Sequence, residues 1–598
     1  MKAIIPLAAC LLASRCALPA QSPAKPAPPD VILITIDTLR ADHVRCYGYS
    51  LIQTPAIDSL AKDGIRFSQA FTPSPITNTS HTTILTGLLP SSHGVTDFGV
   101  PLAAKHPTWA ELVSRSGYHS AAFIGAVILD SKSLAPGLDR GFDFYDNFPA
   151  HPTTKERWGR VERRGMEVVQ RAETWLAAHP GRRHFLWVHL YDPHDPYEPP
   201  LPYARTYKDR LYDGEIAYAD AALGNLLAYL KAHHSYEDSL IVLVGDHGEG
   251  LGEHHEDTHG IFLYDSTMHV PLLVKLPGHT SAGKVVEAQV RTTDILPTVL
   301  DVLKVPGSVR FDGESLQPYF AGTGSTDRVA FGETDYPLRF GWAPLRSVRS
   351  DGFKFIEAPR PELYNLRADP GELDNTYAPW SDAVRKSRAL LADLRSKLPS
   401  AAPSTATVGQ GTLSELRALG YLGPADAGSS TTVPEPSLLP DPKDRILEQN
   451  LLHRAMMLSD SGQTPEARQA LERALELNPK SPVALCQLGE LELEAGEYSK
   501  AAVHLKSARE ARPDDRTAAY DLGQALEKTG DLEGARDALE TSLKLTPGQA
   551  SARVLLGNVY FRLKNFPAAE DQFEAALLLE PDDADAKAGL AKVKAAKP

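Results

Sequence analysis

The chain has 598 residues, a formal net charge of -14 and 42% hydrophobic residues. A chain of this length exceeds what one hydrophobic core usually supports, so we expect two or more domains. The negative charge disfavours nucleic acid and anionic membrane surfaces as partners. The four cysteines, which are scattered between Cys10 and Cys486, are too few for a disulfide framework or a zinc cluster.

Residues 1–20 are typical of an export peptide. Lys2 precedes an apolar run over residues 3–13, and small residues and a proline-rich stretch follow. This run is far shorter than the roughly 20 residues that cross a bilayer, and since no run of that length occurs elsewhere, we expect no transmembrane span. The sequence LAAC, which ends at Cys10, resembles a lipoprotein box, whereas cleavage after Ala20 would leave the protein unanchored. We therefore predict an exported protein, periplasmic or extracellular, with a lipid anchor on Cys10 as the alternative to a soluble form.

Residues 28–395 are predicted to form an α/β domain. Short apolar runs, typical of buried strands, alternate with amphipathic segments typical of helices. The strand-like runs are VILITI (31–36), SAAFIGAVI (120–128), HFLWVHL (184–190), LIVLVG (240–245) and PLLVKL (271–276). Buried strands separated by helices favour a mainly parallel sheet sandwiched by helices, and we expect that architecture here. Shorter strands between 341 and 377 predict a small C-terminal sheet packed on the first.

Residues 444–598 carry a repeat, and residues 396–443 before them have the composition of a linker. Successive prolines lie 34 residues apart, each with an alanine twelve residues before it: Pro479, Pro513, Pro547 and Pro581 with Ala467, Ala501, Ala535 and Ala569. This period, which Gly489, Gly523 and Gly557 also keep, matches the tetratricopeptide (TPR) pattern and predicts an all-α solenoid. The groove of such a solenoid suits a protein partner, so we predict partner binding there and little contribution to the chemistry of the first domain.

Three predicted strands end in side chains that can bind a metal ion. Asp37 follows the first strand, His194 lies shortly after the third, and Asp246 and His247 follow the fourth. In open parallel sheets, ligands bind beyond the carboxyl ends of the strands, so these residues are expected at one edge. Carboxylate combined with imidazole suits zinc or manganese and makes calcium less favoured.

Six segments then resemble, in order, the motifs of the sulfatase family of the alkaline-phosphatase superfamily. They are IDTLRADHVRCYGY, ITNTSHTTILTGLLPSSHG, LYDPHDPYEPP, VGDHGEGLGEH, HGIFLYDSTMHVPLLV and PELYNLRADPGELDN. The resemblance spans roughly residues 28–377 and implies an alkaline-phosphatase-like fold. It also implies a metal-dependent hydrolase of sulfate or phosphate esters, with a cell-envelope or extracellular ester as substrate.

The nucleophile motif departs from that of the sulfatases. Alignment on ILTG (84–87) places Thr77 at the nucleophile and His81 at the arginine of the family pattern. Sulfatases oxidise a cysteine or serine there to formylglycine, and because threonine cannot yield that aldehyde, we expect none. The resemblance extends to relatives that use an unmodified threonine, namely nucleotide pyrophosphatases and phosphoethanolamine transferases. The alternative interpretation is that Thr77 only caps the helix that it begins.

The resemblance also implies a role for each remaining site residue. One divalent metal ion, with zinc or manganese favoured and calcium or magnesium possible, is expected on Asp37, Asp246, His247 and the oxygen of Thr77. The resemblance implies that His194 and His259 hold substrate oxygens or protonate the leaving group, and that His81 orients the nucleophile. The alternative is that His259 faces water in a polar loop together with His254 and His255.

Two other functions are compatible with the sequence. A phosphotransferase would move a head group onto a cell-envelope glycan or lipid through a covalent intermediate on Thr77. A TPR scaffold protein would carry an inactive first domain. The complete ligand set at Asp37, Asp246 and His247 argues against the scaffold.

Overall fold

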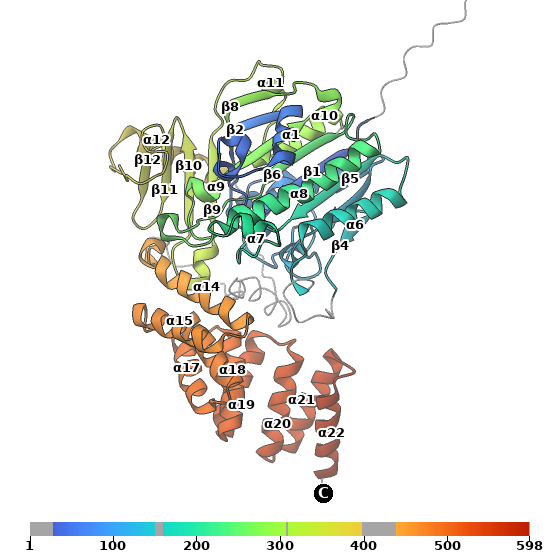
Figure 1. The fold of residues 1–598 in the computed structure, drawn as a ribbon. Helices are drawn as coiled ribbons and strands as arrows, with labels where there is room; N and C mark the ends of the chain where they lie inside the picture. Colours follow the sequence, from blue (N-terminus) through green and yellow to red (C-terminus); the bar gives the residue numbers. More distant parts are fainter. Residues whose placement is uncertain (1–27, 150–159, 306–308, 398–437, 597–598) are drawn as a thin grey trace, which may run out of the picture.

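The computed structural model describes residues 28–149, 160–305, 309–397 and 438–596, which form an α/β body and a helical stack (Figure 1). The predicted export peptide with Cys10 and most of the predicted linker lie outside these residues. Among the described residues, no helix combines the length and the apolar composition needed to cross a membrane.

The main sheet has eight strands in the order β4-β3-β5-β1-β6-β7-β2-β8. The run from β4 to β6 is parallel, β7 runs antiparallel to both β6 and β2, and β8 pairs in parallel with β2. The bounds are β1 (Val31–Ile36), β2 (Ile65–Phe71), β3 (His119–Phe123), β4 (Phe144–Asp146), β5 (His184–Leu190), β6 (Leu240–Gly245), β7 (His269–Lys275) and β8 (Lys284–Arg291). The mainly parallel sheet predicted from the sequence is confirmed.

Helices cover both faces of this sheet, because its central strands are mostly apolar and are buried at every position. In β1, Val31 and Leu33 pack into one hydrophobic cluster, whereas Ile32 and Ile34 pack into the other. The cluster of the first face includes residues of α2 (Thr77–Thr86), α4 (Trp109–Ser114) and α10 (Ile295–Leu303). The cluster of the second face includes residues of α1 (Pro55–Asp63), α6 (Gly165–Ala178) and α8 (Leu211–Ala232). Shorter helices are α3 (Pro90–His93), α7 (Tyr203–Thr206), α9 (Asp265–Met268) and α11 (Gln317–Phe320).

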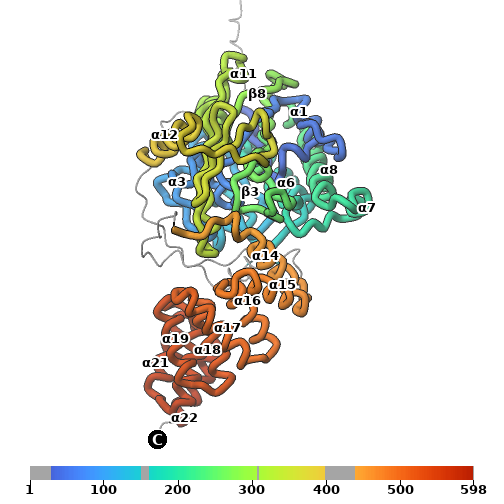
Figure 2. Tube along the Cα trace, turned by 90° about the vertical axis from the view of Figure 1, so that its left-hand side faces the viewer, coloured from blue at the N-terminus to red at the C-terminus, as the bar shows by residue number. Residues whose placement is uncertain are grey.

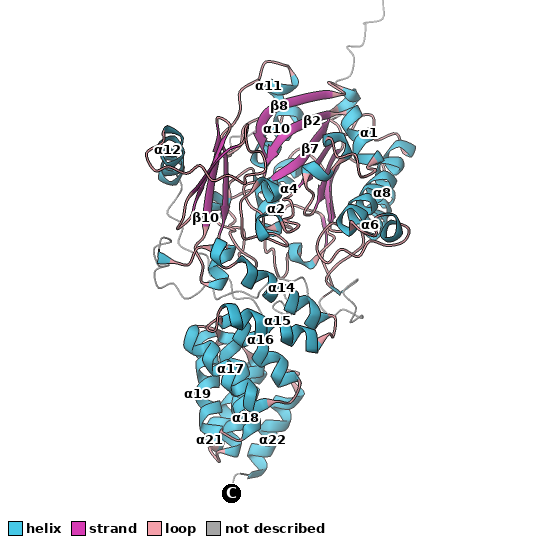
Figure 3. Ribbon diagram, turned by 60° about the vertical axis from the view of Figure 1, so that its left-hand side comes forward, coloured by secondary structure: helices cyan, strands magenta, loops and turns pink. Residues whose placement is uncertain are grey.

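A second sheet of four antiparallel strands has the order β12-β11-β10-β9. Its strands are β9 (Ala330–Thr334), β10 (Leu345–Ser350), β11 (Phe353–Glu357) and β12 (Glu362–Asn365), and α12 (Asp382–Lys397) packs on it. The small C-terminal sheet is therefore confirmed, with β9 beginning before the stretch in which we expected it. Figure 3 shows the two sheets in one body and only helices in the other.

The C-terminal body is the predicted solenoid of helix pairs. Its helices are α14 (Ile446–Asp460), α15 (Thr464–Leu477), α16 (Pro482–Glu494), α17 (Tyr498–Ala511), α18 (Arg516–Thr529), α19 (Leu532–Leu545), α20 (Ala550–Arg562), α21 (Phe566–Leu579) and α22 (Ala584–Ala596). The repeated glycines allow close contact within each pair: a Cβ atom on Gly523 would lie 2.6 Å from Cγ of Leu539. Small residues at these positions therefore set the helix spacing that the repeat requires.

The solenoid is docked on the α/β body through its first helix. Leu452, Ala455 and Met456 of α14 belong to the same buried hydrophobic cluster as residues of β1 and β6. In Figures 1 and 2, α14 lies between the α/β body and the remaining helices. A second contact lies further along the stack, where Arg512 Nη2 donates to the carbonyl oxygen of Arg339 at 2.6 Å. The two bodies therefore do not depend on a linker alone to remain together.

Candidate active site

The site lies at the carboxyl ends of β1, β5 and β6, as the sequence predicted. Ile36 of β1 pairs with Gly245 of β6, so the next residues, Asp37 and Asp246, leave the sheet side by side. Asp37, Asp246 and His247 are all completely buried. Parallel pairing thus brings together side chains that are about two hundred positions apart in the chain.

Three ligand atoms of these residues are directed at one point. His247 Nε2 lies 3.4 Å from Asp246 Oδ2 and 3.8 Å from Asp37 Oδ1. Both carboxylate oxygens lack a hydrogen-bond partner among the described residues. The other ring nitrogen of His247, Nδ1, donates to the carbonyl oxygen of Gly248 at 2.9 Å, which leaves a lone pair on Nε2. Two unpaired oxygens and one lone pair form a donor set that fits a metal cation.

The electrostatics of the cluster also favour a cation. Burial raises the pKa of Asp37, and the charges of Glu249 and Glu162 raise it further. Burial and the charge of Asp37 likewise raise the pKa of Asp246, while burial lowers the pKa of His247. Two buried carboxylates beside a neutral imidazole require a positive charge if both are to ionise, and a divalent ion would supply it.

A second layer of hydrogen bonds orients the two carboxylates. The backbone N–H of Gly125 donates to His189 Nδ1 at 3.1 Å, so the imidazole proton is on Nε2 and is donated to Asp37 Oδ2 at 3.1 Å. Asp246 Oδ1 accepts from the backbone N–H groups of Thr38 and His247. Each carboxylate therefore has one satisfied oxygen and one open oxygen. Sequence reasoning missed His189, although a histidine inside an otherwise apolar buried strand is a usable signal.

Thr77 is the first residue of α2, and its hydroxyl faces the metal-ligand cluster. Thr77 Oγ1 lies 3.1 Å from His247 Nε2, and the residue is completely buried. The N-cap of α2 is Ile76, and no side chain caps the helix, so Thr77 does not have the capping role of the alternative interpretation. The hydroxyl of Ser80 donates to the carbonyl oxygen of Asp246 at 2.6 Å and ties α2 to the end of β6.

His81 lies one helical turn after Thr77, beneath the nucleophile position. Its Nδ1 donates to the carbonyl oxygen of Thr77 at 2.8 Å. Its Nε2 accepts from the hydroxyl of Thr35 at 3.0 Å, and that hydroxyl in turn accepts from the indole N–H of Trp187. These bonds fix the start of α2 relative to β1 and β5, which is consistent with an orienting role.

His259 and His194 extend the site beyond the cluster of Asp37, Asp246 and His247: His259 lies beside His247, and His194 lies beside His259. The ring of His259 lies 4.5 Å from the ring of His247 and 5.0 Å from that of His194, measured between centroids. His259 Nδ1 lies 3.0 Å from Glu249 Oε1. His194 stacks on Tyr191 at 4.4 Å, and both histidines are almost fully buried, so neither is a solvent-facing loop residue. The structure therefore brings all seven predicted site residues together.

Glu249 is a site residue that sequence reasoning did not predict. It is completely buried, and burial raises its pKa, while burial lowers the pKa of His259 to about 3. Its backbone carbonyl accepts from Arg40 Nη1 at 3.1 Å, which connects the loop after β6 to the loop after β1. A glutamate two residues after the ligand pair in VGDHGEGLGEH was visible in the sequence, but its distance from His259 was not.

Comparisons with known protein families match both parts of the chain. The sulfatase family model matches residues 29–305, and the C-terminal model of N-sulphoglucosamine sulphohydrolase matches residues 252–400. TPR models match residues 448–491, 486–550 and 526–593. The chain therefore carries a sulfatase-family domain, which is followed by C-terminal TPR repeats.

Proteins similar to this chain include sulfatases and, by fold, a phosphonate monoester hydrolase. The uncharacterized sulfatase YidJ of Escherichia coli K12 is 26% identical over 62% of this chain and 85% of its own length. The multifunctional alkaline phosphatase superfamily protein PehA of Trinickia caryophylli is 24% identical, with 58% and 90% covered. The phosphonate monoester hydrolase of Agrobacterium radiobacter has a TM-score of 0.54 at 23% identity, with 62% and 96% covered, which establishes the shared fold.

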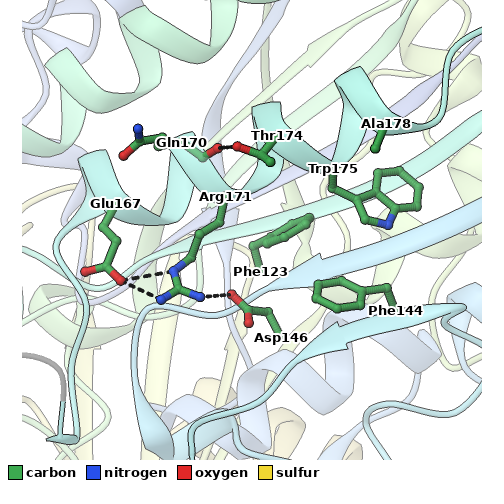
Figure 4. Close-up of a pocket in the computed structure, with 9 residues that line it drawn as sticks. All are labelled: Phe123, Phe144, Asp146, Glu167, Gln170, Arg171, Thr174, Trp175 and Ala178. Atoms are coloured by element: carbon green, nitrogen blue, oxygen red, sulfur yellow. Dashed lines mark hydrogen bonds and ion pairs between the residues drawn. The ribbon is translucent and has the colours of Figure 1, made fainter. Parts of the chain in front are cut away.

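A separate pocket of about 540 Å³ lies between α6 and the β3–β4 edge (Figure 4). Phe123, Phe144 and Trp175 form its apolar side. The guanidinium group of Arg171 is held between the carboxylates of Glu167 and Asp146. None of the predicted site residues lines this pocket, and its one cationic side chain is already paired with two carboxylates, so we do not assign it to the ester chemistry.

Proposed function

We propose that this sulfatase-family chain hydrolyses phosphate esters through a covalent intermediate on unmodified Thr77. The observation that carries the proposal is the position of the Thr77 hydroxyl, 3.1 Å from the metal-facing nitrogen of His247. A threonine hydroxyl is too weakly acidic to ionise by itself near neutral pH. Its placement beside a dianionic donor set supports activation by a cation that the same residues hold.

Asp37, Asp246 and His247 would hold one divalent ion, with zinc or manganese favoured by the mixed oxygen and nitrogen donors. When bound, this ion supplies positive charge that stabilises the Thr77 alkoxide and the charge on the ester oxygens. His189 keeps the Asp37 carboxylate oriented through Nε2, and His81 holds the backbone of Thr77 in place.

Thr77 acts as the nucleophile, and the histidines beyond it supply the proton for the leaving group. Thr77 Oγ attacks phosphorus and loses its proton to solvent, and the bond from phosphorus to the leaving oxygen breaks. That oxygen takes a proton from His259 or His194, the two histidines that extend from the cluster. Glu249, whose pKa is raised by burial, lies 3.0 Å from His259 Nδ1, so a protonated Glu249 would pass a proton to Nδ1 as His259 gives its own proton to the leaving oxygen. Water then cleaves the bond between phosphorus and Thr77 and restores the hydroxyl.

Threonine favours phosphorus over sulfur as the attacked atom. The hydrated aldehyde of a sulfatase carries two hydroxyl groups on one carbon, and the second group can expel sulfate after transfer. Thr77 has one oxygen on Cβ and lacks this route, so its intermediate is released only by a second attack at the central atom. Phosphate esters of serine and threonine nucleophiles undergo such an attack, and we therefore place phosphate esters before sulfate esters.

The test uses the full-length protein and a panel of aryl phosphate monoester, aryl phosphodiester and aryl sulfate, each with Zn²⁺, Mn²⁺, Ca²⁺ or Mg²⁺. We expect Thr77→Ala to lower kcat on the best substrate at least about 1000-fold, because the nucleophile is removed. Thr82→Ala is the matched control. Among the described residues, this buried hydroxyl of the same helix donates only to the carbonyl oxygen of Asn78, so its loss should leave kcat nearly unchanged.

Near-full activity in Thr77→Ala would overturn the assignment of the nucleophile. A clear preference for aryl sulfate would overturn the choice of phosphate esters. Mass spectrometry of the peptide that contains Thr77 should show the unmodified residue.

We further propose that the protein is exported and acts on esters of the cell envelope or the extracellular space. The support is the signal-like sequence of residues 1–20, with Cys10 as the alternative site of a lipid anchor. The TPR stack is proposed to bind a protein partner in its groove. Fractionation of cells that produce the full chain, compared with a Cys10→Ala variant, would separate the soluble from the anchored form.

A further inference from the structure

One helix of the TPR stack reaches the loops that carry two of the proposed catalytic histidines. His453 of α14 has its Nε2 atom 2.9 Å from Asp195 Oδ2. Asp195 directly follows His194, and its carbonyl oxygen accepts from His194 Nδ1 at 2.6 Å. The side chain of His453 is only 12% exposed, so this is an interior contact between the two bodies. A residue of the repeat stack thus holds the segment that sets the position of His194.

The same helix also holds the loop that carries His259. Asn450 Nδ2 donates to the carbonyl oxygen of His255 at 2.8 Å, and Asn450 Oδ1 lies within reach of the backbone N–H of Asp257. Asn450 and His453 are three positions apart and therefore share one face of α14. That face contacts both catalytic loops.

The attachment of α14 does not depend on either polar contact. Leu452, Ala455 and Met456 are buried in the hydrophobic cluster shared with the α/β body. At the end of the helix, Asp460 pairs with Arg160 at 2.9 Å. Removal of the His453 side chain is therefore expected to loosen the loop at Asp195 while the helix stays docked.

The charges of His453 and Asp195 also affect the pKa of His259, one of the two proposed acids. The pKa of His259 is set first by burial, then by the charges of His453 and Asp195, which act in opposite directions. Glu249, the partner of His259, experiences the same two charges. The His453–Asp195 pair is thus close enough to act electrostatically on the His259–Glu249 pair.

We propose that α14 is a wall of the active site and that His453 is a positioning residue, which holds His194 against the reacting ester through Asp195. The inference rests on the proposed ester hydrolysis. It replaces the sequence-based expectation that the repeats contribute little to catalysis, because that expectation assumed that only a linker connects the two bodies.

The test compares two histidine variants in the full-length chain, with the best aryl ester as substrate. His453→Ala should lower kcat about 10-fold to 100-fold, since small displacements of a catalytic group cost rates of this order. KM, bound metal and the unfolding midpoint should stay close to those of the wild type. His453→Gln, which keeps an N–H donor for Asp195, should restore most of the lost kcat.

His504→Ala is the matched control. His504 of α17 makes the same kind of contact, with Nδ1 2.8 Å from Glu492 Oε2, but entirely within the repeat stack. Its removal should leave kcat within about twofold of the wild type, because the His504–Glu492 contact involves no residue of the site.

A double-mutant cycle adds a second, independent measurement. If His453 acts through Asp195, the losses of His453→Ala and Asp195→Ala should not add up in the double variant. A wild-type kcat in His453→Ala, or fully additive losses, would overturn the positioning role. Absence of turnover by the wild type on every ester would instead overturn the proposed function, so the two failures are distinguishable.

Discussion

Asp37 and Asp246 are completely buried, and each keeps one carboxylate oxygen without a hydrogen-bond partner in the part of the chain that the structure describes. An unpaired buried charge is costly, and folded proteins retain it where another ligand completes it. The lone pair of His247 Nε2 faces the same point. At the scale of single residues, these donor atoms form a set that fits a cation.

This arrangement predicts the metal content of two variants. Asp246→Asn and His247→Ala should each retain much less than one equivalent of metal after dialysis, because the ion loses a ligand from a small set. Elemental analysis of the purified full-length proteins measures this content. His233→Ala, at the exposed C-cap of α8, is the control and should keep the wild-type metal content. Stoichiometric metal in both ligand variants would place the site elsewhere.

At the scale of elements, Asp220 of α8 supplies the cap that α1 lacks. Thr54, the N-cap of α1, makes no capping bond, and the carboxylate of Asp220 accepts from the backbone N–H groups of Ala56 and Ile57 instead. Burial raises the pKa of Asp220 to about 7. The carboxyl group of Asp220 thus connects α1 to α8, and its raised pKa means that burial disfavours its ionised form.

The raised pKa predicts how stability changes with pH. A carboxyl group whose pKa is higher in the folded state contributes its full stability below its unfolded pKa of about 4, and this contribution falls as pH rises to about 7. Asp220→Asn cannot ionise, so its unfolding free energy relative to the wild type should rise across this window. The slope is at most roughly 1.4 kcal/mol per pH unit. Urea unfolding at several pH values measures it, and a constant difference would contradict the prediction.

The repeat glycines make a second prediction for elements. Gly523→Ala would place a Cβ atom 2.6 Å from Leu539 Cγ, which is a branch point and cannot swing away. Overpacking of this kind costs about 1–3 kcal/mol, which outweighs the gain of about 1 kcal/mol from replacing glycine by alanine in a helix. We therefore expect a lower urea midpoint for the unfolding of the stack. Gly548→Ala, where the Cβ atom meets nothing within 4 Å, should be neutral and serves as the control.

The main elements and much of the site followed from local patterns in the sequence. Central strands such as β1 and β6 are almost entirely apolar, and the sequence shows a repeat of 34 residues. Asp37, Asp246 and His247 were predicted because strand ends in a parallel sheet share an edge. The antiparallel direction of β7 was not predicted, because strand direction depends on pairing with distant residues rather than on composition.

At the scale of the whole molecule, contacts between the two bodies could not be predicted. His453 occupies an unremarkable position in a repeat helix, and its partner Asp195 lies 258 positions earlier. A periodic pattern identifies the small residues that pack a repeat. The polar residues of a helix follow no such pattern, so their contacts with distant residues cannot be predicted from it. The contribution of α14 to the site therefore required the structure.

α14 belongs to the repeats by sequence and to the hydrolase by its contacts. A recombination event that exchanged the repeats at the preceding linker would also remove Asn450 and His453 from the catalytic loops. The segment needed for full catalysis therefore extends beyond residue 400, where the match to the sulfatase-type models ends. It includes all of α14, which ends at Asp460. Chimaeras in which this sulfatase-family domain receives foreign repeats should be joined after that helix.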